Sequence, residues 1–153
     1  MTFDYRDGNI DDIEDVFRLN RKVFDEAWSK DMMLQSLQVG YDLYVCHQQK
    51  SLVGYLLCQD ILFETQVMQL GVDQAYRRKG VAKELMQMLI QEKKEMDMIM
   101  LEVRASNVDA QAFYLDLSFA EVGRRPKYYK QTPTKPSEDA ILMSLNPQNF
   151  KSQ

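Results

Sequence analysis

The sequence predicts a single α+β domain over residues 1–153, in which helices flank both faces of a mixed, mostly antiparallel sheet, giving three layers. Two observations support this fold class. Three strand-like runs follow one another with connections too short for a crossover, which is typical of an antiparallel meander. A helical segment and a strand-helix-strand unit come next, and such a unit adds a parallel pair to the sheet. Because 45% of the 153 residues are hydrophobic, the chain has enough apolar material for its own core.

The first half of the chain reads as one strand, two helices and the meander. The first helix is indicated by apolar residues at helical spacing, and we expect Ile10, Ile13, Phe17 and Leu19 on its buried side. Polar or glycine-containing turns separate the runs of the meander. The elements expected here are helices over 10–24 and 30–37 and strands over 2–6, 41–46, 52–61 and 65–72.

The second half begins with a change of period, because apolar residues recur at helical spacing between residues 77 and 94. The stripe of this central helix is expected to comprise Val81, Leu85, Met88 and Leu89. Residues 130–139 contain two prolines and no apolar side chain, which predicts a loop joining the last two strands. The remaining expected elements are a helix over 107–117 and strands over 98–103, 119–129 and 140–145.

Composition excludes several classes of site. Cys46 and Cys58 lie outside any CxxC motif, and His47 is the sole histidine, which argues against an ordinary zinc site and a Ser-His-Asp triad. No apolar run approaches the roughly 18 to 20 residues of a membrane span, and the amino terminus lacks a signal-peptide pattern, so we expect a cytosolic protein. The net charge of −4 arises in residues 1–31, which hold nine acids and five bases; a nucleic-acid-binding surface is not indicated.

A basic loop precedes the central helix in the run QLGVDQAYRRKGVA, residues 69–82. The first turn of a helix presents N–H groups without intrahelical acceptors and the positive end of the helix dipole, so it favours a phosphate. Gly80 permits close approach of a ligand, and the cations before it add attraction, which suits a diphosphate. Taken alone, this pattern also fits an ordinary solvated loop. Neither GxxxxGK[ST] nor GxGxxG occurs, which disfavours the two commonest nucleotide folds.

The spacing Q/R-x-x-G-x-G/A is met by Arg77, Gly80 and Ala82, and here the sequence resembles the GCN5-related N-acetyltransferase (GNAT) superfamily. The resemblance continues in LEVRASNVDAQAFYLDLSF, RRPKYY, EDAILMSL and AWSKDMM, and it is nearest to the ribosomal-protein-alanine N-acetyltransferase branch. It implies acetyl-CoA as cosubstrate, no metal, and transfer to a free amine. The favoured acceptor is the amino-terminal alanine of a small-subunit ribosomal protein, a basic partner. Another amine (a protein lysine, a polyamine or an aminoglycoside) and a non-catalytic coenzyme A-binding module remain the alternatives.

For the coenzyme, the resemblance implies a bulge at Gly71 that turns the backbone of Leu70 and Val72 towards the pantetheine arm. The N–H of Val72 would then face the thioester oxygen as an oxyanion donor. Gly71 could instead merely relieve crowding, since glycine in a strand also marks close approach of other groups. Asn107 is implied as a coenzyme contact, with plain helix capping as its alternative. The diphosphate contacts implied are Arg77, Arg78, Lys79, Gly80, Val81 and Ala82.

The resemblance makes Glu102 the general base and Tyr114 the acid that protonates the leaving thiolate. Glu102 shares a strand face with Met98 and Met100, so we expect it to be desolvated, which suits a proton acceptor. A surface carboxylate, or one paired with Arg104, is the alternative. For Tyr114 the alternative is a buried core residue.

Tyr128 and Tyr129 resemble the substrate-side lip of the family, where rings flank an extended peptide, although strand aromatics often only pack. The acid-rich amino-terminal third favours a basic peptide, or is simply a solvated helix face. Ser106 and Asp109 have capping-box spacing and predict a helix start. Ser118 replaces the glycine that the family has after this helix, so we expect a slightly shifted turn.

Overall fold

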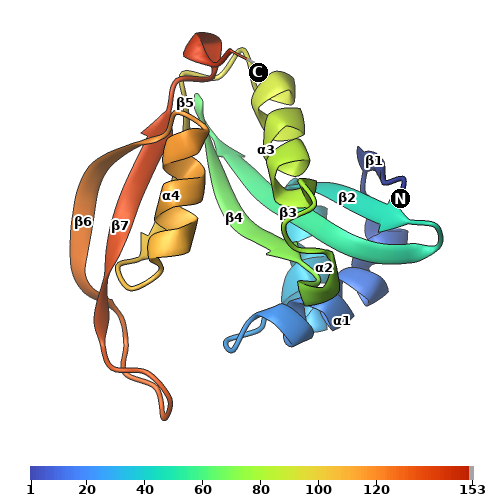
Figure 1. Ribbon diagram of the computed structural model, residues 1–153, viewed down its shortest axis with the longest axis horizontal. Helices are drawn as coiled ribbons and strands as arrows, with labels where there is room; N and C mark the ends of the chain where they lie inside the picture. The colour runs from blue at the N-terminus through green and yellow to red at the C-terminus, as the bar shows by residue number, and fades with distance from the viewer. Residues whose placement is uncertain (152–153) are drawn as a thin grey trace. The chain divides into compact units, whose positions relative to one another are not determined.

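The computed structural model describes residues 1–151 (Figure 1). Its strands follow the order β1-β2-β3-β4-β5-β7-β6, in which each strand is hydrogen-bonded to the next. β4 and β5 pair in parallel, while β1–β2, β2–β3, β5–β7 and β6–β7 are antiparallel, which confirms the predicted mixed, mostly antiparallel sheet. The chain divides into two compact units. Unit 1 comprises residues 1–60 and 67–92, and unit 2 comprises the rest.

Unit 1 holds a sheet between helices on either face. One core joins the two amino-terminal helices to sheet residues Leu43, Val45, Tyr55 and Leu57. A Cβ at Gly54 would lie 2.7 Å from Val81 and 3.3 Å from Leu85, so the third helix covers the opposite face. The elements of this unit are β1 (Asp4–Asp7), α1 (Ile13–Val23), α2 (Lys30–Gln38), β2 (Asp42–Gln48), β3 (Ser51–Ile61), α3 (Val81–Glu92) and most of β4 (Glu64–Val72).

The first helix begins three residues later than its apolar period suggests. Ile10 opens a short 3-10 turn that precedes α1, and it is 55% exposed, so its predicted burial is wrong. The cause is local: Asn9 and Asp12 form a capping box around this turn, and the two guanidinium nitrogens of Arg6 contact Asp12 at 2.6 and 2.9 Å. The α-helix therefore starts only at Ile13.

The stripe of α3 is wider than predicted. Val81, Leu85 and Leu89 are buried as expected, but Met88 is half-buried, and Met86 and Ile90 are buried in its place. Residues at i, i+4 and i+5 share one broad face of a helix, and a helix that lies across a sheet buries such a broad face. The helix starts at Val81, directly after the basic loop.

Unit 2 consists of a strand-helix-strand unit followed by an antiparallel hairpin. Its elements are β5 (Met98–Arg104), α4 (Val108–Asp116), β6 (Ala120–Tyr129) and β7 (Glu138–Leu145). β7 is the central strand of the three and pairs with both β5 and β6. It begins at Glu138, two residues before the predicted start, because Glu138 pairs with Tyr129 across the hairpin. Residues 1–151 include no helix long and apolar enough to span a membrane.

Candidate active site

The loop that opens α3 has the backbone geometry of an anion-binding turn. Arg78 and Gly80 both have positive φ, +61° and +83°, and alternation of left- and right-handed residues turns successive N–H groups towards one point. The Gly80 carbonyl accepts the first bond of the helix, from Glu84 N–H at 3.0 Å. Arg77, Arg78 and Lys79 are exposed. A Cβ at Gly80 would meet nothing within 4 Å, so the approach is open to a phosphate within this unit.

Gly71 lies in β4 beneath a buried polar cluster. A Cβ there would lie 2.7 Å from Cε1 of Tyr55 and 3.3 Å from Val23, so glycine is required for packing. Tyr55 cannot move away, because its hydroxyl donates to Gln69 Oε1 at 3.0 Å and accepts from Asn20 Nδ2 at 2.8 Å. Relief of crowding is therefore one role of Gly71, and its bulge stays a prediction. The neighbours Leu70 and Val72 are half-buried.

Asn107, and not Ser106, caps α4, so the predicted capping box is wrong. The Asn107 side chain accepts from Ala110 N–H at 3.1 Å, whereas the Ser106 N–H donates to Glu138 Oε1 at 3.0 Å. Asn and Ser are about equally good N-caps, so the choice was made by tertiary contact. Capping occupies the Asn107 carbonyl and leaves its amide group as a donor for a ligand.

Glu102 shares its strand face with Met98 and Met100 as predicted, but the desolvation expected for it is wrong. Its side chain is 30% exposed, and Oε1 lies 3.6 Å from Nε of Arg125. Burying an unpaired carboxylate is costly, so Glu102 keeps contact with solvent and with a cation. Glu102 is thus accessible to a substrate amine.

Tyr114 is a buried core residue of unit 2. Its ring packs edge-to-face on Phe113 and Phe119, at centroid distances of 5.1 and 5.7 Å. Burial alone raises the pKa of this phenol, so it stays protonated throughout the working range. Among residues 1–151 no buried side-chain oxygen or nitrogen lacks a hydrogen-bond partner.

Tyr128 and Tyr129 form the end of β6, where their rings meet edge-to-face at 5.2 Å. Each ring also carries a guanidinium: Arg104 lies 4.2 Å above Tyr129, and Arg125 lies 5.4 Å from Tyr128. Burial, and next the charge of Glu102, raise the pKa of Tyr129. The two tyrosines thus lie together with the candidate base, and we call Arg104, Arg125, Tyr128 and Tyr129 the lip.

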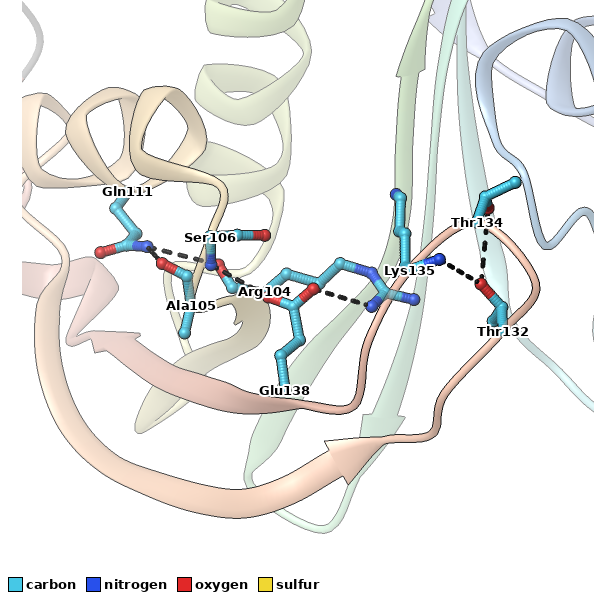
Figure 2. Close-up of polar contacts among 8 residues, drawn as sticks. All are labelled: Arg104, Ala105, Ser106, Gln111, Thr132, Thr134, Lys135 and Glu138. Atoms are coloured by element: carbon cyan, nitrogen blue, oxygen red, sulfur yellow. Dashed lines mark hydrogen bonds and ion pairs between the residues drawn. The ribbon is translucent and has the colours of Figure 1, made fainter.

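Two polar residues of this face, Arg125 and Glu138, were not predicted; Arg125 is the partner of Glu102. Figure 2 shows Glu138 between Arg104 and the N–H of Ser106. Nearby, the Gln111 side chain donates to the carbonyls of Arg104 and Ala105 at 3.3 and 3.0 Å. The predicted loop over 130–139 is wrong at Glu138, because this polar run hides the start of β7.

The turn between β6 and β7 is itself ordered by hydrogen bonds. Thr132 N–H donates to the Lys135 carbonyl at 2.8 Å. Figure 2 shows a second contact of this turn, in which Thr132 Oγ1 accepts from Lys135 N–H at 3.0 Å. Residues 1–151 contain no group of three His, Cys, Asp or Glu side chains arranged to hold a metal ion.

Comparison with known proteins identifies the class. Residues 13–119 match the model of the acetyltransferase (GNAT) family, so the chain belongs to this family. It is an N-acetyltransferase of the GNAT type, and enzymes of this type use acetyl-CoA. The prediction of family and enzyme class is confirmed.

The relatives narrow the resemblance further. The chain is 30% identical over 136 residues to the [ribosomal protein bS18]-alanine N-acetyltransferase of Escherichia coli K12, covering 88% of this chain and 90% of that protein. Its identity to the N-alpha-acetyltransferase of Saccharolobus solfataricus is 28%, over 93% of this chain and 92% of that one. The crystal structure of the ribosomal-protein-S18-alanine N-acetyltransferase from Escherichia coli superposes with a TM-score of 0.90 at 26% identity, covering 99% and 98% of the two chains.

Proposed function

We propose that this enzyme transfers the acetyl group of acetyl-CoA to the amino-terminal alanine of a small-subunit ribosomal protein. The observation that carries the coenzyme part is the exposed loop with left-handed Arg78 and Gly80 at the start of α3. Its amides, with those of Val81 and Ala82, are the donors for the paired phosphates, and Arg77 and Lys79 add charge attraction. Asn107 supplies a further amide donor to the coenzyme from the cap of α4.

The chemistry proposed needs a base, an oxyanion donor and an acid. Glu102 takes the proton of the amine, directly or through one water, as the amine attacks the thioester carbonyl. The N–H of Val72, beside Leu70 and Gly71, faces the developing oxyanion, and loss of one such donor typically costs about 10² to 10³ in rate. The Tyr114 hydroxyl donates to the departing sulfur. Burial raises the pKa of that phenol, which disfavours loss of its proton, so the hydroxyl acts on the departing thiolate mainly as a hydrogen-bond donor.

Relatives of two kinds support an α-amine as the acceptor. One kind is named as an alanine N-acetyltransferase of ribosomal protein bS18, and the other as an N-alpha-acetyltransferase. The lip adds a physical reason, because two tyrosine rings beside Glu102 can flank an extended peptide. A ribosomal protein as partner also agrees with the expected cytosolic location.

The test uses acetyl-CoA and two peptides of one basic sequence. One has a free amino-terminal alanine, and the other is blocked there but carries internal lysines. Acetylation confined to the free terminus supports the proposal. Reaction of the blocked peptide alone would refute the acceptor while leaving the chemistry in place. If neither reacts while coenzyme A raises the melting temperature, the protein is a coenzyme-binding module.

The role of Glu102 is tested separately by Glu102→Gln. Turnover should fall with little change in coenzyme affinity, and the pH-rate profile should change. An unchanged pH-rate profile would remove Glu102 from the mechanism. Tyr114→Phe is the companion variant for the acid.

A further inference from the structure

One carboxylate on this face of unit 2 holds two elements at once. Glu138 Oε2 accepts from Arg104 Nη1 at 3.1 Å, and Glu138 Oε1 accepts from the N–H of Ser106 at 3.0 Å (Figure 2). Both side chains of the ion pair are largely buried, with 14% of Glu138 and 18% of Arg104 exposed. The hydrogen bond from Ser106 and the guanidinium lower the pKa of Glu138, so it is charged at neutral pH. This pair is therefore a fixed feature and not a loose surface contact.

The arginine that Glu138 holds is also the support of a lip ring. Arg104 lies 4.2 Å above the ring of Tyr129, the closest cation–ring distance in residues 1–151. A guanidinium that is free to rotate spends little time on one ring, whereas one bonded by a carboxylate on its other side is restricted to it. Glu138 is also the direct cross-strand partner of Tyr129. Its carboxylate thus fixes the position of the Arg104 guanidinium and, through Arg104, the position of the Tyr129 ring.

Arg104 could pair with either of two carboxylates, Glu102 or Glu138, and in the structure Glu138 binds it. Arg104 and Glu102 lie two residues apart on the same face of β5, so Glu102 is within the reach of a freed arginine. In the structure Glu102 instead contacts Arg125, whose guanidinium lies on Tyr128. Arg104 thus contacts Glu138 and the ring of Tyr129, and Arg125 contacts Glu102 and the ring of Tyr128.

We propose that Glu138 is a positioning residue for the acceptor: it fixes Arg104 on Tyr129 and so holds the lip in the shape that binds the peptide next to Glu102. This inference rests on the proposed function, since it takes the lip as the acceptor site. Glu138 does not touch the reacting atoms in this scheme. Its effect falls on acceptor binding: the basic loop that opens α3 belongs to unit 1, and the side-chain oxygen of Glu138→Gln can still accept from Ser106 N–H, which keeps the Asn107 cap in place.

The experiment compares Glu138→Gln with Glu121→Gln as a matched control. Glu121 is also paired with an arginine of β6, Arg124 at 3.2 Å, but this pair is exposed (47% and 55%) and lies off the lip. The Glu138→Gln side chain has the shape of the original but presents an NH₂ group or an uncharged oxygen to Arg104. Arg104→Lys is the second variant, because it keeps the charge and the Ser106 bond while losing the planar stack on the ring.

We expect Glu138→Gln and Arg104→Lys each to raise the acceptor KM roughly tenfold, which matches the usual worth of a partly desolvated cation–π contact. The coenzyme Kd and kcat should change less than threefold, and Glu121→Gln should behave as wild type. The double variant should resemble the single ones, because both remove the same contact. If Glu138 and Arg104 only stabilised the fold, the variants would instead have lower melting temperatures, and coenzyme binding would weaken as much as acceptor binding.

KM is measured on whichever of the two peptides the wild-type enzyme uses, so the two proposals fail separately. Use of the blocked peptide by wild type would refute the acceptor assignment and still allow the KM comparison. An unchanged KM in Glu138→Gln, or additive effects in the double variant, would overturn the positioning role. If wild type neither acetylates nor binds either peptide, both proposals are wrong.

Discussion

Replacing Ser118 by glycine should stabilise the protein. Ser118 follows α4 with φ +74°, a left-handed conformation that costs a residue with a Cβ roughly 1–2 kcal/mol. The turn is a complete helix end, with Ser118 N–H bonded to the Leu115 carbonyl at 2.9 Å and Phe119 N–H to the Tyr114 carbonyl at 3.0 Å. These bonds hold Ser118 in place, so it bears the cost instead of relaxing.

The net gain is smaller than that cost. Glycine loses more backbone freedom on folding, about 0.4–1 kcal/mol, which leaves about 0.5–1 kcal/mol in favour of Ser118→Gly. For a chain of this size, 1 kcal/mol corresponds to roughly 2–4 °C in Tm. Thermal unfolding followed by circular dichroism, at a fixed protein concentration and without coenzyme, measures the shift.

Ser118→Ala is the matched control for this prediction. Alanine keeps the Cβ and its left-handed strain, so it should give no rise in Tm. Equal melting temperatures for the glycine variant and wild type would contradict the reasoning, as would a rise of the same size with alanine. The predicted shift of this turn is not seen in the hydrogen bonds, since Ser118 adopts the conformation that glycine would take.

Three further predictions concern packing, charge and capping. Gly71→Ala should cost about 1–3 kcal/mol in urea unfolding, because its Cβ overlaps the immobile ring of Tyr55; a neutral result would mean that the ring can move. Asp12→Asn should cost about 1–2 kcal/mol at pH 7, a value discounted because Arg6 is half-exposed. The hydrogen bond from Arg6 lowers the pKa of Asp12, so this stabilisation is present above the unfolded value of about 3.9 and is lost as pH falls through the lower folded value; the two proteins should converge in acid. Asn107→Ser should keep stability, since serine caps equally well, yet weaken coenzyme binding several-fold as measured by calorimetry; unchanged binding would leave Asn107 only a cap.

The order and type of the elements could be predicted from the sequence, because hydrophobic period and turn residues report on local structure. The predictions failed where a tertiary or capping contact decided between two local structures that the sequence favours about equally. Ser106 and Asn107 are similar N-caps, and the bond between Ser106 and Glu138 selected the second. Ile10 fits a helical period, but the capping box at Asp12 delays the helix past it.

The partner of Glu102 shows the same limit within the site. Alternation along β5 gives the face of Glu102 correctly, but β6 is separated from β5 by β7, so its register cannot be inferred from short-range spacing. β6 also contains an irregularity between Arg125 and Tyr129, where Lys127 has φ +50°. A second irregularity, between Glu121 and Gly123, shifts the register ahead of Arg125 and puts Arg125 on the face of Glu102, whereas the one after Arg125 decides where Tyr128 and Tyr129 lie.

The exposure of Glu102 bears directly on which amine the enzyme can use. Glu102 lies in contact with solvent and with the guanidinium of Arg125, so the neutral fraction that the amine itself supplies decides which acceptor reacts. An α-amino group with a pKa near 8 is about one-quarter neutral at pH 7.5, whereas about one lysine in a thousand is neutral, a difference of roughly 200-fold. We therefore expect kcat/KM for the free-terminus peptide to level off above about pH 8, while that for any lysine peptide keeps rising towards pH 10. Equal rates on the two peptides at pH 7.5 would show that the site deprotonates lysine by some other means, and the α-amine assignment would lose its physical basis.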